Sequence, residues 1–322
     1  MRNKASNSSN NSNGFMNILS KILSDAKLPH LGLVFYKVLV YKFVENNSNS
    51  GENVSKSEEN PLEKGLKAEE FARKLESTLR ELEKYSLETP RLPCKKSFEL
   101  KTAYRLAIGM GYPSLLENGF LFHHTYGIPY IPGETLKGLA RHVLLLSIYE
   151  EIKEKLASIQ EPLNYLDKYL SSKEEEFSKN SLTKTLDGKE IGIVLSEYKI
   201  REPHRVFRRI FGTQEKRGEV IFLDAFPKNF NPQDLELDIM NPHYAGYYTE
   251  KGKDPPGDWE NPVPIKFLTL KKGTTFIFCL DYEPLGEEEP ELLEHAYNLL
   301  RVGLENLGVG GKKAKGYGWF EA

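Results

Sequence analysis

Hydrophobic positions recur at helical spacing most clearly in three parts of this 322-residue chain. A charged segment between Pro61 and Pro90 has apolar residues three or four positions apart, and the same spacing recurs over residues 135–148 and 291–307. This spacing places apolar side chains on one face of a helix, which can then pack against a core. The pattern predicts three amphipathic helices, and Gly308 directly after the last one is typical of a helix C-terminus.

Alternating hydrophobic and polar positions predict strands around the last two helices. Residues 98–108 place Phe98, Leu100, Tyr104, Leu106 and Ile108 on one parity, which is typical of a strand with one buried face. Shorter extended runs cover residues 220–225, 274–282 and 317–320. The resulting order is strand, helix, strand, strand, helix, strand. This βαββαβ order predicts an α+β fold of the ferredoxin-like (RRM-like) type.

Other segments precede or interrupt this predicted unit. Two stretches rich in Asn and Ser are expected to be disordered, because their composition cannot bury enough apolar surface to fold. We therefore predict the following organisation: an N-terminal extension at residues 1–92, disordered at 1–13 and 46–60 and otherwise helical, then a ferredoxin-like domain at 93–322 with insertions at about 150–217 and 227–273.

Composition limits the functions open to the chain. Lys plus Arg number 44 and Asp plus Glu number 46, so any binding of a polyanion must come from local patches. No run of about 18 apolar residues and no apolar signal segment occurs, so we expect a cytoplasmic protein with no membrane partner. Cys94 and Cys279 lack a C-x-x-C partner and are expected to be reduced thiols. No cluster has metal-ligand spacing, so neither a metal nor another cofactor is expected.

A segment rich in glycine and lysine follows the last predicted helix. Residues 308–319 read G-V-G-G-K-K-A-K-G-Y-G-W, with five glycines and three lysines. Glycine lets backbone approach another molecule closely, and lysines attract polyanions such as nucleic acid. The same composition also fits a simple turn with solvated lysines. A Walker-type nucleotide loop is excluded, because Asn306 stands where its first glycine should be and Lys313 replaces its hydroxyl residue.

Two further groups of polar side chains are candidates for binding or catalysis. Lys137 and Arg141 lie one turn apart on the second predicted helix, where they are either a solvated surface or a contact for phosphates. The candidates for a general base are His123, His124, His204 and His243. His123 and His124 should point to opposite faces of an extended segment, so structural or RNA-stacking roles are favoured over one shared catalytic site.

Several motifs, taken in order, resemble those of one known family. I-P-G-E-T-L-K-G-L-A-R at residues 131–141 and G-V-G-G-K-K-A-K-G-Y-G at 308–318 together resemble the RAMP superfamily of CRISPR-associated RNA-binding proteins. More narrowly, four motifs are similar to the sixth-subunit family of the type III-B Cmr effector complex: I-F-G-T at 210–213, F-L-D-A-F-P at 222–227, M-N-P-H-Y at 240–244 and P-V-P-I-K-F-L at 262–268. The likeness spans roughly residues 95–320.

The resemblance implies a ferredoxin-like RAMP fold and a non-catalytic backbone subunit in antiviral defence. Such a subunit would contact the guide (CRISPR) RNA near its 3′ end, pack on other Cmr RAMP subunits and meet target RNA, without a small-molecule substrate. The residues then favoured for RNA binding are Lys137, Arg141, Gly310, Gly311, Lys312, Lys313 and Lys315. Further RNA or subunit contacts would come from His124, Arg205, Arg208, Arg209 and Tyr244.

Two other functions stay open at this point. Some RAMP relatives are metal-independent endoribonucleases with a histidine base, and a related backbone subunit cleaves target RNA with a loop aspartate. Asp254 and Asp258 lie in a long irregular segment here, although no motif assigns that role to either. The other alternative is a scaffold that binds proteins only, in which the glycine-rich segment is merely a turn.

Overall fold

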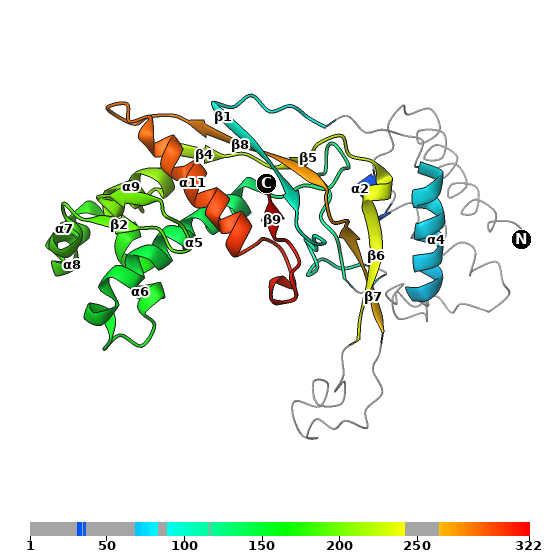
Figure 1. Cartoon of the computed structure of the whole chain (residues 1–322), viewed down its shortest axis with the longest axis horizontal. Helices are drawn as coiled ribbons and strands as arrows, with labels where there is room; N and C mark the ends of the chain where they lie inside the picture. Colours follow the sequence, from blue (N-terminus) through cyan, green and yellow to red (C-terminus); the bar gives the residue numbers. More distant parts are fainter. Residues whose placement is uncertain are drawn as a thin grey trace, which may run out of the picture. The chain divides into compact units, whose positions relative to one another are not determined.

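The computed structural model of the chain (Figure 1) describes residues 31–33, 35–36, 68–82, 89–114, 116, 118–241 and 264–322. The chain divides into two compact units. Unit 1 comprises Met1–Thr89, Gly109–Pro129 and Asn229–Leu270, and unit 2 comprises Pro90–Ile108, Tyr130–Lys228 and Lys271–Ala322.

Unit 2 is built on an antiparallel sheet in which the strand order is β4, β8, β1, β9 (Figure 1). The strands are β1 (Lys96–Thr102), β4 (Val220–Phe222), β8 (Thr275–Tyr282) and β9 (Phe320–Glu321), with short β5 (Phe226–Pro227) also paired to β8. The central pair, β1 and β8, runs in register from Lys96 opposite Leu280 to Lys101 opposite Thr275. The outer strands β4 and β9 are both short, so β1 and β8 provide most of the sheet.

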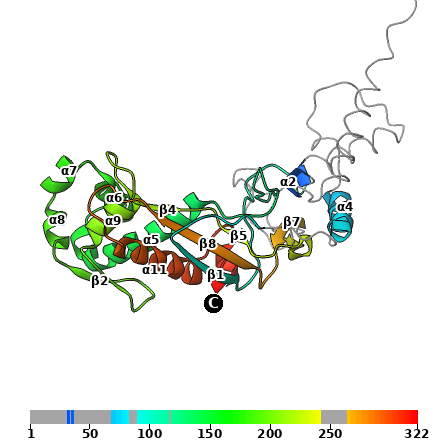
Figure 2. The same cartoon turned by 90° about the horizontal axis from the view of Figure 1, so that it is seen from above.

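Two long helices, α5 (Gly133–Ile152) and α11 (Glu291–Asn306), lie side by side against this sheet (Figure 2). Their close approach depends on Gly303, since a Cβ there would lie 2.7 Å from Leu139 Cγ. In chain order the elements are β1, α5, β4, β8, α11 and β9. The order predicted from the hydrophobic pattern is therefore present, and the prediction of an α+β fold is confirmed.

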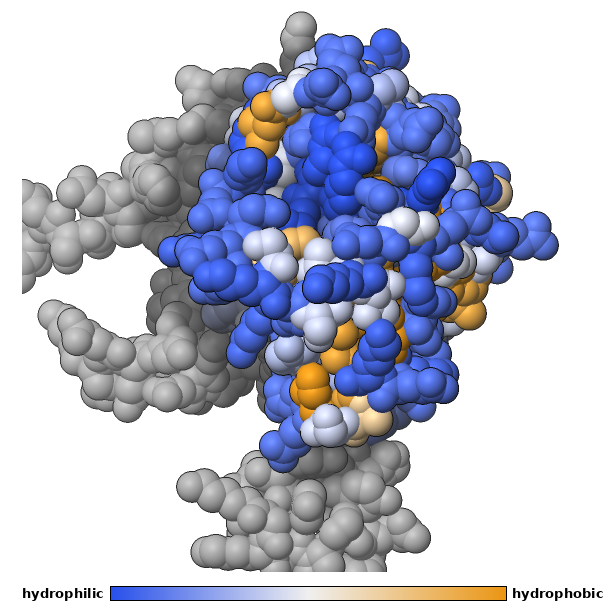
Figure 3. Space-filling model, turned by 90° about the vertical axis from the view of Figure 1, so that its left-hand side faces the viewer, coloured by the Kyte–Doolittle hydropathy of each residue, from blue (hydrophilic) through white to orange (hydrophobic). Residues whose placement is uncertain are grey.

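The segment between α5 and β4, where the sequence predicted an insertion, folds into a mainly helical layer. It contains η4 (Lys153–Leu156), α6 (Pro162–Ser171), α7 (Glu174–Lys179), α8 (Ser181–Leu186), the hairpin of β2 (Glu190–Gly192) and β3 (Lys199–Arg201), and α9 (Pro203–Phe211). The apolar side chains of α9, including Val206, Phe207 and Ile210, are buried. Viewed from the end that carries α7 and α8, unit 2 is largely hydrophilic, with small separate apolar patches (Figure 3).

Unit 1 contains a helix and a two-stranded ribbon. Its described elements are α2 (Leu31–Leu33), α4 (Ala68–Glu81), η5 (Pro232–Asp234), β6 (Leu235–Met240) and β7 (Ile265–Leu270). β6 and β7 pair antiparallel, and α4 contacts both strands. Elsewhere in the unit, the Tyr36 hydroxyl donates to Phe120 O at 2.6 Å and accepts from Phe120 N at 2.9 Å.

Three strand predictions differ from the structure, and the smallest of these differences is in the strand predicted over residues 220–225, which forms β4 over Val220–Phe222 only. The strand predicted over residues 98–108 ends at Thr102, because the pairing of β1 with β8 stops there and the chain instead bonds to the segment before β9. Tyr104, predicted on the buried face, is 40% exposed as a result. The closing strand is Phe320–Glu321 rather than residues 317–320, and β6 was not predicted at all.

Several predictions fall outside the described residues. These are the disorder of residues 1–13 and 46–60 and the candidate roles of His243, Tyr244, Asp254 and Asp258. The predicted domain boundary at residue 92 and the predicted insertions stay predictions. Over the ranges that the structure covers, no helix has the length and apolar character needed to span a bilayer.

Candidate nucleic-acid interface

The glycine- and lysine-rich segment forms a compact turn between α11 and β9. Gly308 closes the helix in the left-handed conformation, with φ of +68° and its amide donating to Gly303 O at 2.9 Å. Lys312 also has positive φ, +57°, and Gly316 has φ of +91°. Between them Lys313–Lys315 form one turn of 3-10 helix, η6. We call residues 312–316 the lysine turn.

Glycines at the base of this turn serve close packing of the chain on itself. A Cβ at Gly318 would lie 1.8 Å from Val309 O, and one at Gly310 would lie 2.3 Å from Ala107 O. The amide of Gly311 donates to Ala107 O at 2.7 Å. RNA contacts from Gly310 and Gly311 stay predictions, and the geometry gives Gly310 a structural reason to be glycine.

The tip of the lysine turn presents positive charge to solvent. Lys313 and Lys315 are exposed, and Lys312 is half-buried. Within the residues that the structure describes, the ammonium groups of Lys313 and Lys315 have no carboxylate within ion-pair distance. Their charge is therefore available to an external anion such as an RNA phosphate.

The two basic residues of α5 that were predicted to bind RNA, Lys137 and Arg141, have different surroundings. The Arg141 guanidinium forms an ion pair with Asp167 Oδ1 at 2.7 Å, donates to Ser171 Oγ at 2.7 Å and lies over the Phe207 ring. Arg141 thereby links α5 to α6 and α9. Burial lowers the pKa of Lys137, and the nearby Arg141 charge lowers it further. Arg141 is already engaged by Asp167 and Ser171, so an RNA contact is a simpler prediction for Lys137 than for Arg141.

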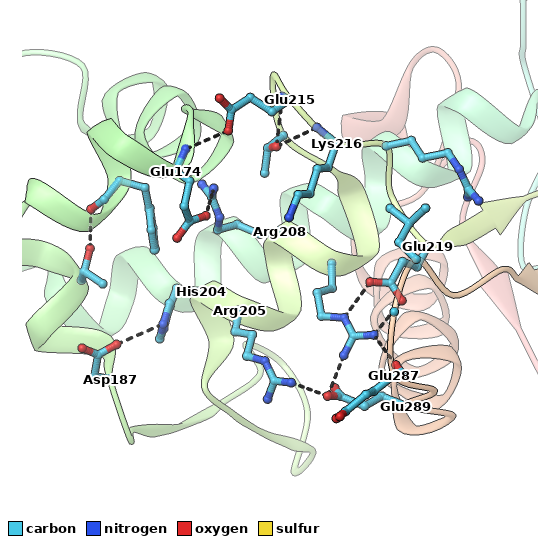
Figure 4. A pocket seen from close by; sticks show the side chains of 17 residues that line it. Glu174, Asp187, His204, Arg205, Arg208, Glu215, Lys216, Glu219, Glu287 and Glu289 are labelled. Atoms are coloured by element: carbon cyan, nitrogen blue, oxygen red, sulfur yellow. Dashed lines mark hydrogen bonds and ion pairs between the residues drawn. The ribbon is translucent and has the colours of Figure 1, made fainter.

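The arginines of α9 lie in a network of carboxylates (Figure 4). Arg209 Nε and Nη2 each lie 2.7 Å from an oxygen of Glu219, and its Nη1 lies 2.6 Å from Glu289 Oε1. The hydrogen bonds to Glu219 raise the pKa of Arg209, and the same bonds hold the pKa of the Glu219 carboxyl below its usual value. This two-point pairing with Glu219 is among the stronger geometries for a guanidinium.

The other two arginines of α9 are also engaged within the chain. Arg208 donates to the carbonyls of Leu170 and Ser172 at 3.0 and 2.9 Å and pairs with Glu174 at 2.9 Å. Arg205 pairs with Glu289. RNA or subunit contacts from Arg205, Arg208 and Arg209 stay predictions, and the geometry favours a stabilising role for them.

A cavity of about 620 Å³ lies next to these arginines. Its lining holds five fixed cations, Arg205, Arg208, Arg209, Lys216 and Arg217, against six carboxylates, Glu174, Asp187, Glu215, Glu219, Glu287 and Glu289. With one more carboxylate than fixed cations, this lining does not attract RNA phosphates. Carboxylates from segments both before and after α9 therefore offset the basic appearance of this helix in the sequence.

His204, one of the candidate bases, lines the same cavity. Its Nε2 lies 3.2 Å from Asp187 Oδ1, and its Nδ1 is buried with no hydrogen-bond partner among the described residues. Burial lowers the pKa of His204, and this effect is larger than the increase that the Asp187 charge causes. The imidazole is therefore neutral at pH 7, but it lies in a cavity whose charge disfavours an RNA substrate.

His123 and His124 lie in unit 1, and their geometry differs from the prediction. The two rings stack with centroids 5.0 Å apart, because residues 124–126 form a turn rather than a continued strand. His124 is exposed, and the His123 Nδ1 accepts from the Thr125 amide at 3.2 Å. The expectation that neighbouring side chains point to opposite faces therefore fails here. An RNA or subunit contact by His124 stays a prediction.

The two cysteines, distant in sequence, are close in unit 2. Cys279 is buried on β8, where burial and a hydrogen bond with Cys94 raise the pKa of its thiol to about 12. Such a thiol is almost entirely protonated at neutral pH and is a poor nucleophile. Among the described residues no group of three or more His, Cys, Asp or Glu side chains could hold a metal ion.

A protein-family model and the sequence of a related protein each match more than half of this chain. The model of the RAMP superfamily matches residues 99–321. The CRISPR system Cmr subunit Cmr6 of Pyrococcus furiosus is 38% identical over 228 residues, a match covering 68% of this chain and 66% of that protein, so slightly less than two thirds of the relative is spanned.

Two solved structures also resemble the chain. The crystal structure of Cmr6 from Pyrococcus furiosus matches with a TM-score of 0.43 and 33% identity over 71% of this chain and 99% of that one. The cryo-EM structure of the Type III-B Cmr-beta bound to cognate target RNA contains a chain that matches with a TM-score of 0.48 and 20% identity, over 96% of each chain.

Proposed function

Because this chain belongs to the RAMP superfamily, we propose that it is a non-catalytic RNA-binding subunit of a type III-B CRISPR (Cmr) effector complex. In this proposal it is cytoplasmic, contacts guide RNA near the 3′ end, packs on neighbouring RAMP subunits and meets target RNA in the assembled complex. Its 38% identity to a Cmr6 subunit supports the assignment to such a complex.

The exposed lysine turn is the observation that carries the RNA-binding part of the proposal. Lys313 and Lys315 are exposed on a turn whose base is held by the Gly311–Ala107 and Val309–Gly318 backbone hydrogen bonds. Because the backbone of the turn is already ordered, binding phosphates costs the freedom of the lysine side chains but little further backbone freedom. Contacts of this kind follow the RNA backbone and do not read base identity.

Two features support a role without catalysis. The lining of the His204 cavity carries a small excess of carboxylates, which opposes entry of a phosphate chain. The exposed His124 stacks on His123, whose Nδ1 already accepts a backbone hydrogen bond. Each histidine therefore has a structural neighbour in the chain, Asp187 for His204 and the His123 ring for His124.

The test of RNA binding removes charge at the lysine turn and, separately, elsewhere in unit 2. We compare Lys312→Ala/Lys313→Ala/Lys315→Ala with Lys168→Ala/Lys173→Ala/Lys184→Ala, whose three lysines are all exposed. Binding of a fluorescein-labelled single-stranded RNA to the full chain is measured by anisotropy at several salt concentrations. The salt slope is the slope of the logarithm of RNA affinity against the logarithm of salt concentration, and each lost phosphate contact lowers its magnitude by about 0.7. The salt slope of the turn variant should therefore fall by about 2, and that of the control by much less.

Three outcomes would contradict the proposal. Equal salt slopes for the two triple variants would favour the protein-only scaffold, and no RNA binding by the unaltered chain would exclude the RNA-binding part. The non-catalytic part is tested by incubating the purified chain with repeat and target RNA. Cleavage that disappears in His124→Ala or His204→Ala would establish the endoribonuclease alternative instead.

A further inference from the structure

Tyr104 lies beside the lysine turn, and we propose that its ring stacks on an unpaired base of the RNA strand whose phosphates the turn holds. This inference rests on the proposed function and names the form of RNA that the site takes, which is single-stranded. The ring and the lysines would then bind adjacent parts of the same nucleotides, the base and the phosphates.

The position of Tyr104 next to the turn follows from its contacts. A Cβ added to Gly316, the last residue of the turn, would lie 4.0 Å from Tyr104 Cδ1, which is ordinary van der Waals contact. Backbone hydrogen bonds hold the two segments together on either side of the ring, from Ala103 N to Trp319 O and from Gly318 N to Arg105 O, both at 2.8 Å. Tyr104 and the lysines therefore belong to one ordered surface.

The ring is held in place and yet remains open to solvent. It packs edge to face with the buried ring of Tyr317, with centroids 5.2 Å apart and planes at 82°. The Arg105 guanidinium lies 5.6 Å from the ring centroid and donates to the Tyr104 hydroxyl at 3.3 Å. The residue is nevertheless 40% exposed. A large aromatic side chain that is both ordered and exposed loses little entropy when a base stacks on it.

The surrounding charge favours RNA as the occupant of this surface. Lys313 and Lys315 lie two residues apart on the adjacent turn, and Arg105 adds a third cation beside the ring. Aromatic side chains within a basic surface are the usual means of binding single-stranded nucleic acid without sequence preference. In a duplex the bases are already stacked on one another, so the ring can be used only by unpaired nucleotides.

Tyr165 provides a matched control within unit 2. It lies on α6 and is 39% exposed, almost the same as Tyr104, but its hydroxyl accepts a hydrogen bond from Asn180 rather than from an arginine. The variants compared are Tyr104→Ala, Tyr104→Leu, Tyr104→Phe and Tyr165→Ala, each made in the full chain. Tyr104→Leu keeps apolar bulk against Tyr317, so a loss in that variant reflects the aromatic face rather than local unfolding.

Three probes of equal length separate stacking from charge: an oligouridylate, an abasic ribose-phosphate chain and an RNA duplex. Tyr104→Ala and Tyr104→Leu should weaken oligouridylate binding roughly 5- to 150-fold, which corresponds to stacking worth about 1–3 kcal/mol. Tyr104→Phe and Tyr165→Ala should bind as the unaltered chain does. Affinity for the abasic chain and the duplex, and the salt slope on every probe, should be unchanged because no phosphate contact is removed.

The possible failures are distinguishable. Equal affinity of Tyr104→Ala and Tyr165→Ala for oligouridylate would overturn the stacking role and leave the proposed function intact. An equal loss on the abasic chain would show that Tyr104 only supports the turn, and loss of subunit association with unchanged RNA affinity would show a protein contact; either result overturns the inference. An unchanged salt slope in the lysine-turn triple variant would overturn the proposed function as well.

Discussion

The lysine turn and helix α9 carry similar charge in the sequence but lie in opposite surroundings. Each places three cations within a short stretch, residues 312–315 in the turn and residues 205–209 in the helix. In α9 every guanidinium is paired with a carboxylate of another segment, whereas Lys313 and Lys315 are exposed at the tip of their turn. A cluster of positive residues binds a polyanion only where the fold leaves its charge uncompensated.

The difference also separates two uses of positive charge. An arginine that is largely buried against a carboxylate stabilises the fold, because removing either partner leaves the other desolvated without compensation. An exposed lysine adds little stability and can instead release counterions when it meets a phosphate. Substitutions at α9 should therefore change stability, and substitutions at the tip of the lysine turn should change RNA binding.

The largest effect is expected at the base of the lysine turn. Gly318→Ala should lower the free energy of unfolding by more than about 3 kcal/mol, because its Cβ would lie 1.8 Å from Val309 O and its φ is +72°. Gly316→Ala, at φ of +91° but with no atom closer than 4.0 Å, should cost only about 1–2 kcal/mol. Urea unfolding of both variants measures the difference, and similar losses would show that the base of the turn is not rigid.

A smaller loss is expected in the α9 network. Glu219→Ala leaves the Arg209 side chain, 17% exposed, without its two-point partner, and we expect a loss of about 2–3 kcal/mol in the free energy of unfolding. The control is Glu283→Ala, which breaks the Arg217–Glu283 pair where both side chains are about half-exposed, and it should cost less than about 1 kcal/mol.

RNA affinity of the same two variants then tests the comparison itself. If α9 only stabilises the fold, Glu219→Ala and Glu283→Ala should bind single-stranded RNA with equal affinity under conditions where both are folded. Tighter binding by Glu219→Ala alone would mean that freeing Arg209 creates a phosphate contact. In that case Glu219 would be the group that keeps Arg209 from binding RNA in the unaltered chain.

The smallest effect is a change in how stability depends on pH. The hydrogen bonds from Arg209 hold the pKa of Glu219 below the ordinary value of 4.5. The unfolded chain therefore takes up this proton at a higher pH than the folded chain does, so the stabilisation is complete above pH 4.5 and is lost as pH falls through the folded pKa. Urea unfolding below pH 4.5 should show a shallower decline for Glu219→Gln than for the unaltered chain, and identical slopes would contradict the assignment.

The local sequence pattern correctly predicted those features that depend on a single helix. The spacing of apolar residues predicted α4, α5 and α11, and glycine chemistry predicted the end of α11 at Gly308. It was a poor guide to strand ends: the alternation through Ile108 continued past Thr102, where the pairing with β8 stops. Sequence periodicity carries no information about which neighbouring strand is available for hydrogen bonding.

The sequence by itself determined the order of the two helices and four strands of the βαββαβ unit and the presence of three lysines among glycines, because helical and strand periods are properties of short segments. The tertiary structure decided which cations are available. Arg209 meets Glu219 ten residues later and Glu289 eighty residues later, and Tyr104 meets Gly316 across an even longer separation. Contacts over such separations arise only when the sheet and helices pack, and they decide whether a charged or aromatic side chain is compensated, buried or open to RNA.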